Sequence, residues 1–351
     1  MIQVKNVSNN WGDFSLRDIS LNIKENEYFI ILGPTGAGKT LLLEIIAGLY
    51  FPKKGKVVIN GNDVTFLNPE HRGLGFVYQD FALFPHLNVK KNIEYGLKLR
   101  KVSEEDREKK ISELAKLLKI KHLLHRDTTT LSGGEKQKVS LARALAINPK
   151  IILMDEPFSA LDENTKSKLI SDMKELHNKG GITFIHVTHS QEEAMLLADR
   201  IGIMMNGTIV QVGNPDDIFY KPITKEIAQF VKIENIWEGK VASRKADEMI
   251  ISINDKNIVA LPDHFKVGDG VRIIIRPEDI ILGKGNTSAR NEFKGKVVSV
   301  VKHGFYHIVR IDCGFQVEAA VTKQSIENLN IKEGTDINIF FKATALQVIK
   351  R

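Results

Sequence analysis

Eight consecutive residues near the N-terminus have the types and spacing of a loop that binds phosphate groups. They fit the pattern G-x-x-x-x-G-K-[ST] and read Gly33-Pro34-Thr35-Gly36-Ala37-Gly38-Lys39-Thr40. Glycines in such a loop let backbone N–H groups face a phosphate, and the positive end of a following helix adds to the attraction. Lys39 is then expected at the β- and γ-phosphate oxygens, and the Thr40 hydroxyl at Mg²⁺.

The residues on either side of this loop indicate the elements that must position it. Residues 27–32 form an apolar run typical of a buried strand, and residues 41–48 have the composition of a helix. A strand, a glycine-rich loop and a helix in that order are the context that a phosphate-binding loop requires. A glycine-rich turn before a helix can also be purely structural, so the assignment depends on motifs farther along the chain.

Two adjacent carboxylates, Asp155 and Glu156, follow four apolar residues that indicate a central strand. Because open α/β sheets bind their ligands at the carboxyl ends of the strands, these carboxylates are expected beside the phosphate-binding loop. His189 follows a second predicted strand at residues 182–187. By itself it would more often be a hydrogen-bonded core histidine, and only its place after Thr188 and a strand favours a functional role.

The most diagnostic segment is Leu131-Ser132-Gly133-Gly134-Glu135, which precedes the acidic pair. With this segment the chain resembles the ATP-binding-cassette (ABC) ATPases, which carry a Leu-Ser-Gly-Gly signature ahead of a second acidic motif. The motifs match that family in order and spacing across residues 11–189. Two departures leave the required chemical groups in place, because Glu135 stands where glutamine is usual and Thr40-Leu41 replaces Ser-Thr.

The resemblance implies a role for each matching residue. The implied ATP-binding residues are Trp11, which would stack on adenine, the loop from Gly33 to Thr40, and the signature residues Ser132, Gly133 and Gly134. The implied catalytic residues are Glu156, His189 and Gln79, and the implied Mg²⁺ ligands are Thr40, Gln79 and Asp155. For Trp11 the alternative is an aromatic side chain that simply packs in the core.

The resemblance also implies an assembly. Ser132 and Gly134 of one subunit would cap the ATP held by Lys39 of another, which gives a head-to-tail homodimer around two ATP molecules. Residues 80–86, after Gln79, would dock a membrane subunit. The implied system is a prokaryotic importer with two transmembrane permease subunits and an extracytoplasmic substrate-binding protein. This chain would lie at the cytoplasmic face of the cell membrane.

Composition limits the classes of protein to which the chain can belong. With 351 residues it is too long for one compact domain, and its single cysteine, Cys313, excludes an internal disulfide. No stretch has the roughly 20 apolar residues that cross a bilayer, so a transport pore would have to be another polypeptide. The formal charge of +7 indicates a lysine-rich surface. No nucleic-acid partner is expected, because stacking aromatics do not alternate with the basic residues.

The chain is predicted to contain two domains of different fold class. Residues 1–232 are expected to form an α/β domain, the P-loop ABC ATPase cassette. Residues 233–351 are expected to form an all-β domain of two small barrels of the oligonucleotide/oligosaccharide-binding (OB) type. A faint repeat supports the two barrels, because residues 238–243 (EGKVAS) recur as residues 294–299 (KGKVVS). Residues 285–288 are the expected joint between them.

Local patterns in the first domain predict several elements. Apolar residues at helical spacing predict a helix over residues 103–124. The dipeptides Asn60-Gly61 and Asn206-Gly207 predict tight hairpins. A further helix is expected to start at Asn214, which is followed by a proline and two acidic residues.

Part of the second domain resembles the molybdate-binding (Mop) module, which occurs in molybdate-responsive regulators and in some molybdate or tungstate import ATPases. The residues that carry this resemblance are Ser288, Arg290, Thr322, Ser325, Lys342, Ala343 and Thr344. In that module they surround a tetrahedral oxyanion, often between two protomers. Hydroxyl and backbone donors with a nearby cation suit a dianion when no carboxylate competes. We expect that a regulatory oxyanion, molybdate or tungstate, bound at these residues inhibits the transporter. A Thr-x-x-Ser pair is also a common helix cap.

Three other functions are open from the sequence. An import ATPase for sulfate, ferric ion, a sugar or a polyamine shares the cassette, and only residues 288–344 argue against it. A non-transport ABC ATPase of DNA repair or translation would carry a long coiled coil or a second cassette, and this sequence has neither. A stand-alone oxyanion store or regulator would have no use for residues 1–232. We therefore expect an ATPase that drives molybdate or tungstate uptake.

Overall fold

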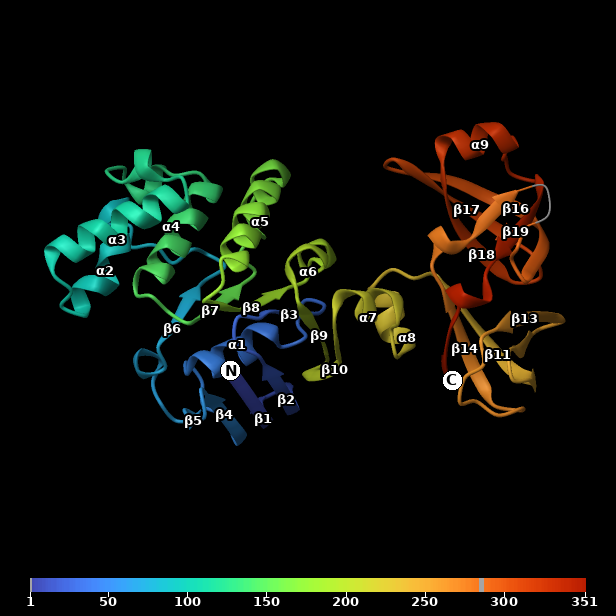
Figure 1. Cartoon of the computed structure of the whole chain (residues 1–351), viewed down its shortest axis with the longest axis horizontal. Coiled ribbons are helices and arrows are strands. Elements are labelled where there is room, and N and C mark those ends of the chain that lie inside the picture. The colour runs from blue at the N-terminus through green and yellow to red at the C-terminus, as the bar shows by residue number, and fades with distance from the viewer. Residues whose placement is uncertain (1, 284–286) are drawn as a thin grey trace. The chain divides into compact units, whose positions relative to one another are not determined.

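The computed structural model describes residues 2–283 and 287–351, and the chain divides into two compact units, Met1–Ile218 and Phe219–Arg351 (Figure 1). The first unit is α/β and the second is almost entirely β, which confirms the predicted fold class. Residues 285 and 286 of the predicted joint lie outside the described residues. The domain boundary at residue 232 stays a prediction.

Two sheets build the first unit. The smaller sheet is antiparallel with the order β2-β1-β4-β5, and its strands are β1 (Ile2–Trp11), β2 (Phe14–Ile23), β4 (Lys54–Ile59) and β5 (Asn62–Asp63). The larger sheet has the order β10-β9-β3-β8-β7-β6. Its strands are β3 (Tyr28–Leu32), β6 (Leu74–Val77), β7 (Ile151–Asp155), β8 (Thr183–Thr188), β9 (Arg200–Met205) and β10 (Thr208–Gly213). All of its neighbouring pairs are parallel except β9 and β10.

Helices cover this larger sheet on both faces. Helix α1 (Lys39–Ala47) contributes Leu42, Leu43 and Ile46 to a core that side chains of both sheets complete. Helices α5 (Glu163–Asn178) and α6 (Gln191–Leu197) lie on the other face, above the sheet in Figure 1. A separate group of helices consists of α2 (Val89–Leu99), α3 (Glu104–Leu117) and α4 (Gly133–Ala146), and α4 packs beside β6.

Short helices complete the connections. They are η1 (Pro69–His71), η2 (Lys121–Leu123), η3 (Thr128–Thr130), α7 (Pro215–Tyr220) and α8 (Lys225–Phe230). No helix in residues 2–283 or 287–351 is long and apolar enough to cross a membrane.

The local predictions for the first unit are mostly confirmed. Asn60 and Asn206 have φ of 50° and 48° in the tight turns β4–β5 and β9–β10, each followed by a glycine with positive φ. The Asn214 side chain accepts a hydrogen bond from the Asp217 amide and so caps α7. The helix over residues 103–124 is wrong in length. It ends at Leu117, because Lys119 takes a left-handed φ of 58° and starts a new turn.

The second unit contains two five-stranded antiparallel sheets with the orders β13-β12-β11-β14-β20 and β15-β19-β16-β17-β18. The strands are β11 (Asn235–Arg244), β12 (Met249–Ile253), β13 (Lys256–Ala260), β14 (Gly270–Ile275), β15 (Ile281–Gly283), β16 (Asn291–His303), β17 (Tyr306–Asp312), β18 (Gln316–Thr322), β19 (Asp336–Phe341) and β20 (Gln347–Lys350). Besides α8, the helices of this unit are η4 (Pro277–Asp279), α9 (Lys323–Leu329) and η5 (Ala343–Ala345).

The two halves of this unit exchange their last strands. Strand β15 follows the first half in sequence but pairs with β19 of the second half. Strand β20 ends the second half but pairs with β14 of the first half. Side chains of both halves share one continuous apolar core. The two similar halves expected from the repeat are therefore five-stranded sheets that are interlocked through a reciprocal strand exchange.

The repeated glycines explain why the two halves share the sequence G-K-V. A Cβ atom on Gly239 would lie 2.7 Å from Ile251 Cγ2, and one on Gly295 would lie 2.6 Å from Ile311 Cγ2. Both glycines sit on the long first strand of their half, where the next strand crosses closely. Only glycine leaves room for that approach, so the repeat marks a packing requirement.

Candidate nucleotide site

Four neighbouring strands of the parallel sheet, β3, β8, β7 and β6, deliver the predicted site residues to one edge. Strand β3 is followed by the phosphate-binding loop, β8 by His189, β7 by Glu156, and β6 by Tyr78 and Gln79. Because these strands run parallel, their carboxyl ends meet at the same edge. The structure thus brings together residues that are separated by up to 156 positions in the sequence.

The loop itself is shaped by two glycines that no other residue could replace without displacement. A Cβ atom on Gly33 would lie 2.1 Å from the Met204 carbonyl oxygen. Gly38 has a left-handed φ of 98°, and a Cβ atom there would lie 2.6 Å from the Phe14 ring. The chain therefore turns tightly before α1, as a loop that approaches phosphates must.

The Lys39 side chain lies inside this loop and is 5% exposed. Its Nζ donates hydrogen bonds of 2.9 Å to the carbonyl oxygens of Gly33 and Pro34. Burial lowers the pKa of Lys39, and the negative charges of Glu156 and Asp155 act in the opposite direction. The cation is thus held at the loop, where it can meet an anionic ligand.

Thr40 and Asp155 form the group of oxygen atoms that fits Mg²⁺. The Thr40 hydroxyl donates a hydrogen bond of 3.0 Å to Asp155 Oδ1. Burial raises the pKa of Asp155, and the hydrogen bond from Thr40 opposes that rise. A cavity of about 630 Å³ is lined by Asp155, Gln79 and Ser159 among others. Hydroxyl, carboxylate and amide oxygens are the hard ligands that Mg²⁺ prefers.

Glu156 is held in a strained backbone conformation beside His189. Its φ is 40°, in the left-handed region that costs a non-glycine residue about 1–3 kcal/mol. Its amide donates to the Val187 carbonyl at 2.9 Å, which ties it to β8. Its Oε2 lies 3.2 Å from His189 Nδ1. Two of the three predicted catalytic side chains, Glu156 and His189, are therefore in contact in the described structure.

A buried network behind His189 was missed by the sequence reasoning. The Glu193 carboxylate accepts a hydrogen bond of 2.6 Å from the Thr188 hydroxyl and pairs with Lys166 Nζ at 2.8 Å. His186 Nε2 lies 3.4 Å from the same carboxylate. Burial raises the pKa of Glu193, but the nearby His186 and the hydrogen bonds from Lys166 and Thr188 outweigh it and bring the pKa to about 2.

This network fixes the residue immediately before His189. Lys166 comes from α5 and Glu193 from α6, so the pair joins the two helices that flank the site. The signal available in the sequence was only a Glu four residues after a predicted functional histidine. That spacing is too common on helices to indicate a role without the tertiary contacts.

Trp11 lies at the end of β1, opposite Phe14 of β2 in the antiparallel register. Because Phe14 packs at Gly38, this register brings Trp11 toward the phosphate-binding loop. Trp11 is half-buried and its ring meets Tyr50 edge to face, with centroids 5.9 Å apart. The ring thus remains partly accessible, as a stacking role for a nucleotide base requires.

The signature segment forms the start of α4. The glutamate at position 135, where glutamine is usual, can cap the helix there. Ser132 and Glu135 form a capping box, in which the Ser132 amide donates to Glu135 Oε2 at 2.8 Å. Glutamate therefore serves the cap as well as glutamine would. Gly134, in the first turn of α4, packs against the start of α5, since a Cβ atom there would lie 2.2 Å from Thr165 Cγ2.

The residues predicted to bind an oxyanion are spread over several places in the second unit. Lys342 and Thr344 line a cavity of about 600 Å³ together with Asp263, Asp279 and Arg276. The negative charges of these two carboxylates would repel a dianion in that cavity. Ala343, between the two lining residues, is buried in η5.

The other predicted oxyanion residues do not line this cavity. The Thr322 and Ser325 hydroxyls lie 3.0 Å apart, and Thr322 caps α9. Ser288 and Arg290 precede β16. The described chain thus groups these residues in pairs, and a single chain does not gather all of them around one point.

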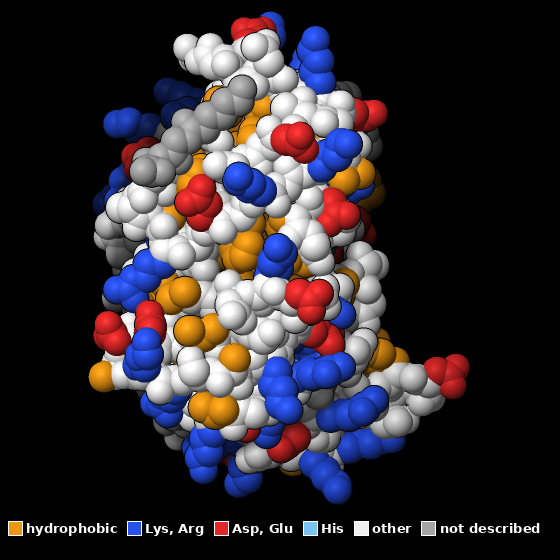
Figure 2. Space-filling model, turned by 90° about the vertical axis from the view of Figure 1, so that its right-hand side faces the viewer, with side chains coloured by type: hydrophobic (Ala, Val, Ile, Leu, Met, Phe, Trp, Pro, Cys, Tyr) orange, Lys and Arg blue, Asp and Glu red, His pale blue; other side chains and the backbone are white. Residues whose placement is uncertain are grey.

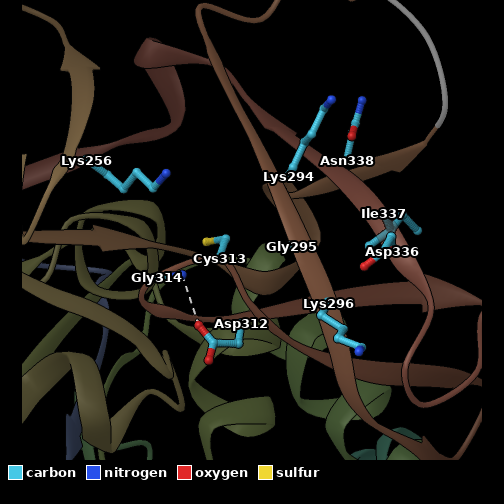
Figure 3. Close-up of a pocket in the computed structure, with 10 residues that line it drawn as sticks. All are labelled: Lys256, Lys294, Gly295, Lys296, Asp312, Cys313, Gly314, Asp336, Ile337 and Asn338. Atoms are coloured by element: carbon cyan, nitrogen blue, oxygen red, sulfur yellow. Dashed lines mark hydrogen bonds between the residues drawn. The ribbon is translucent and has the colours of Figure 1, made fainter.

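A larger cavity of about 830 Å³ in the second unit was not anticipated from the sequence. Three lysines line it, Lys256, Lys294 and Lys296, together with Asp312 and Asp336 (Figure 3). In the close-up the side chains point in different directions and do not converge on one point. Figure 2 shows Lys and Arg side chains gathered in the lower part of the face drawn there, and acidic and basic side chains mixed in its upper part.

Comparison with known proteins identifies the family. A family model described as ABC transporter matches residues 16–159, and one described as TOBE domain matches residues 287–348. The chain is 45% identical over 353 residues to a molybdate/tungstate import ATP-binding protein of Pyrococcus abyssi, covering 99% of this chain and 100% of that protein. It is 34% identical over 358 residues to a spermidine/putrescine import ATP-binding protein of Borreliella afzelii, covering 100% of this chain and 99% of that protein.

Solved structures agree with the architecture of the first unit. A dimeric ATP-binding cassette in a post-hydrolysis state, bound to ADP and Pi, matches with a TM-score of 0.56 and 34% identity, covering 61% of this chain and 99% of that one. Together with the full-length relatives and the geometry at the sheet edge, this match settles the family. The chain belongs to the ABC transporter family, as an ATP-binding subunit with a C-terminal TOBE domain.

Proposed function

We propose that this chain is the ATP-hydrolysing subunit of an importer for molybdate or tungstate. The observation that carries the proposal is its full-length similarity to molybdate/tungstate import ATP-binding proteins, which reaches 45% identity with that of Pyrococcus abyssi. A second such relative, from Methanocaldococcus jannaschii, is 39% identical over 97% of the chain. The contacts among Thr40, Asp155, Glu156 and His189 support ATP hydrolysis as the source of energy.

In this proposal each group at the sheet edge has a chemical task. Lys39 and the amides of its loop bind the phosphates of ATP, and Thr40, Asp155 and Gln79 hold Mg²⁺. Mg²⁺ at that place supplies positive charge against the phosphate oxygens. Glu156 accepts a proton from the attacking water. His189 contacts the Glu156 carboxylate and orients that carboxylate.

The proposed assembly is a homodimer with two permease subunits. Ser132, Gly133 and Gly134 of one subunit close over the ATP of the other, while Trp11 stacks on its adenine. The dimeric cassette among the similar structures supports this arrangement. Residues 80–86 dock a permease at the cytoplasmic face of the membrane, and an extracytoplasmic binding protein delivers the anion.

We assign residues 1–232 to nucleotide binding and residues 233–351 to regulation by an oxyanion. Ser288, Arg290, Thr322, Ser325, Lys342, Ala343 and Thr344 supply the donors for that anion. Their distribution over separate places in one chain favours a site completed by a second protomer. Bound anion then opposes ATP-driven closure of the dimer, and closure weakens anion binding by the same factor.

The test is transport by the chain, its permease and the extracytoplasmic binding protein in sealed vesicles, with ATP on the side of this chain. Uptake is measured with molybdate, tungstate, sulfate and spermidine. Uptake of molybdate or tungstate, lost in Glu156→Gln, is the expected result. Spermidine uptake would support the second candidate, a polyamine importer, which the 34% identical relative favours. If neither molybdate nor tungstate is transported, the proposal is overturned.

A further inference from the structure

The chain bends sharply immediately after Gln79, at two consecutive non-glycine residues with positive φ. Phe81 has a φ of 65° and Ala82 a φ of 43°. Each such residue costs about 1–3 kcal/mol, and the conformation persists only where the surroundings impose it. Two of them in succession, within the proposed docking residues 80–86, indicate a segment that is held under strain.

Side chains of helix α4 hold this segment by hydrogen bonds to the backbone carbonyls of Phe81 and Ala82. Arg143 Nη1 donates to the Ala82 oxygen at 2.6 Å, and Nη2 donates to the Phe81 oxygen at 3.1 Å. The Ser140 hydroxyl donates to the same Phe81 oxygen at 3.0 Å. Ser140 is fully buried, and the Arg143 guanidinium lies over the Phe84 ring at 5.3 Å. Charge-assisted bonds to both strained residues are the strongest kind available here.

The far end of the segment is fixed by a different helix. Asn92 of α2 is fully buried, and its side chain accepts a hydrogen bond from the Phe84 amide at 2.9 Å. The same side chain donates to the Phe84 and Leu87 oxygens. Residues 81–84 are therefore attached to α4 at one end and to α2 at the other, and α2 itself packs against α4. Ser140 and Arg143 are the side chains that join the strained end directly to α4.

Arg143 lies on the same helix as the signature residues. The first turn of α4 carries the signature residues, and Ser140 and Arg143 lie two to three turns farther along the same helix. We propose that Arg143, assisted by Ser140, is a positioning residue that connects the signature helix mechanically to the permease-docking segment. A displacement of α4 when the signature meets ATP then moves or releases residues 81 and 82. The inference rests on the proposed docking role of residues 80–86.

The attachment can be tested in the isolated protein, without any permease, by hydrogen exchange of the Phe81 and Phe84 amides. Loss of charged hydrogen bonds in Arg143→Ala should speed that exchange about tenfold or more. Arg143→Lys should be intermediate, because lysine lacks the planar fork that reaches two carbonyls. Lys138→Ala is the matched control, since it removes a cation from the same helix that pairs with Asp172 instead. Unchanged exchange in Arg143→Ala would overturn the attachment.

A second substitution separates strain from general damage to the fold. Glycine takes a positive φ without steric cost, so Ala82→Gly should keep the bend when the arginine is absent. The double variant Arg143→Ala/Ala82→Gly should regain slow exchange in part. If Arg143→Ala only loosened the whole domain, the added glycine would loosen it further, and that result would overturn the proposal.

The functional link is tested with the permease in vesicles. Arg143→Ala should keep basal ATPase within about twofold while its stimulation by the permease and the anion taken up per ATP fall about tenfold. The double variant should recover part of both, and Lys138→Ala should match wild type. Faster exchange with unchanged coupling would overturn the mechanical link. Failure of wild type to transport any tested anion would instead count against the proposed function.

Discussion

Asn235 and Asn291 make the same pair of hydrogen bonds in opposite directions between the two halves of the second unit. Asn235, at the start of β11, binds the backbone N–H and C=O of Glu318 in β18, at 2.7 and 2.8 Å. Asn291, at the start of β16, binds the backbone N–H and C=O of Val259 in β13, at 2.8 and 2.9 Å. Both side chains are buried, and each closes the edge strand of the opposite sheet.

Replacing either asparagine by alanine should therefore destabilise the second unit. Each change leaves a buried backbone donor and acceptor without a partner, which costs about 1–3 kcal/mol for each unsatisfied group. Asn338→Ala is the control, because its side chain bonds to Glu292 at the exposed surface. Denaturant unfolding of the full chain measures the change. Equal stability of Asn235→Ala and the control would show that water replaces the lost partner.

Glu156→Gln should abolish ATP turnover and preserve ATP binding. The amide keeps the size of the carboxylate and can still contact His189, but it cannot accept a proton from water. The variant should therefore accumulate as an ATP-dependent dimer. Phosphate release and sedimentation are measured on the same samples. Turnover at the wild-type rate would exclude the general-base role.

Thr40→Val should raise the Mg²⁺ concentration needed for ATPase activity, because the hydroxyl that bonds to Asp155 is lost without a change in size. Thr40→Ser is the matched control, since it keeps the hydroxyl. The loss of one oxygen ligand is expected to lower the affinity for Mg²⁺ about tenfold or more. The measurement is a Mg²⁺ titration of ATPase at fixed ATP. Identical titrations of the two variants would remove Thr40 from the site.

The buried Glu193 predicts a pH dependence of stability. Its pKa is about 2 in the folded chain against an ordinary value of 4.5, so the folded state prefers the ionised form. The resulting stabilisation, on the order of 3 kcal/mol, is complete above pH 4.5 and is lost as the pH falls toward 2.

In Glu193→Gln this part of the pH dependence should vanish, and the variant should be less stable than wild type at neutral pH. Urea unfolding between pH 2 and 7 gives both curves. Glu175→Gln serves as the control, because its partner Lys179 is exposed. Parallel curves for Glu193→Gln and wild type would mean that other carboxylates account for the acid sensitivity.

Lys342→Ala should relieve inhibition by an oxyanion and leave basal ATPase unchanged. The cation that lines the cavity with Thr344 is lost, while the nucleotide site is in the other unit. ATPase of the reconstituted transporter is measured against molybdate, tungstate and sulfate. A coupling of ~1–3 kcal/mol would change the affinity for anion about five- to 150-fold between states. Absence of inhibition in wild type would leave the second unit without a regulatory role.

The nucleotide site could be predicted from the sequence to the extent that its parts are contiguous. The loop around Lys39 and the pair Asp155-Glu156 each carry their chemistry within a few neighbouring residues, next to the strand that positions them. Parallel strands then bring such segments to one edge, whatever the rest of the chain does. The repeat around Gly239 and Gly295 predicted two similar halves for the same reason, since a close strand crossing leaves a local trace.

What the sequence alone could not determine are the contacts between distant segments. Glu193 depends on Lys166 from another helix, and Arg143 acts on carbonyls 61 and 62 residues away. The exchange of β15 and β20 reverses the pairing that chain order suggests. The tertiary structure decided these features because a buried charge or a buried strand edge without a partner costs free energy. The partner that satisfies it is the group nearby in space, whatever its distance in the sequence.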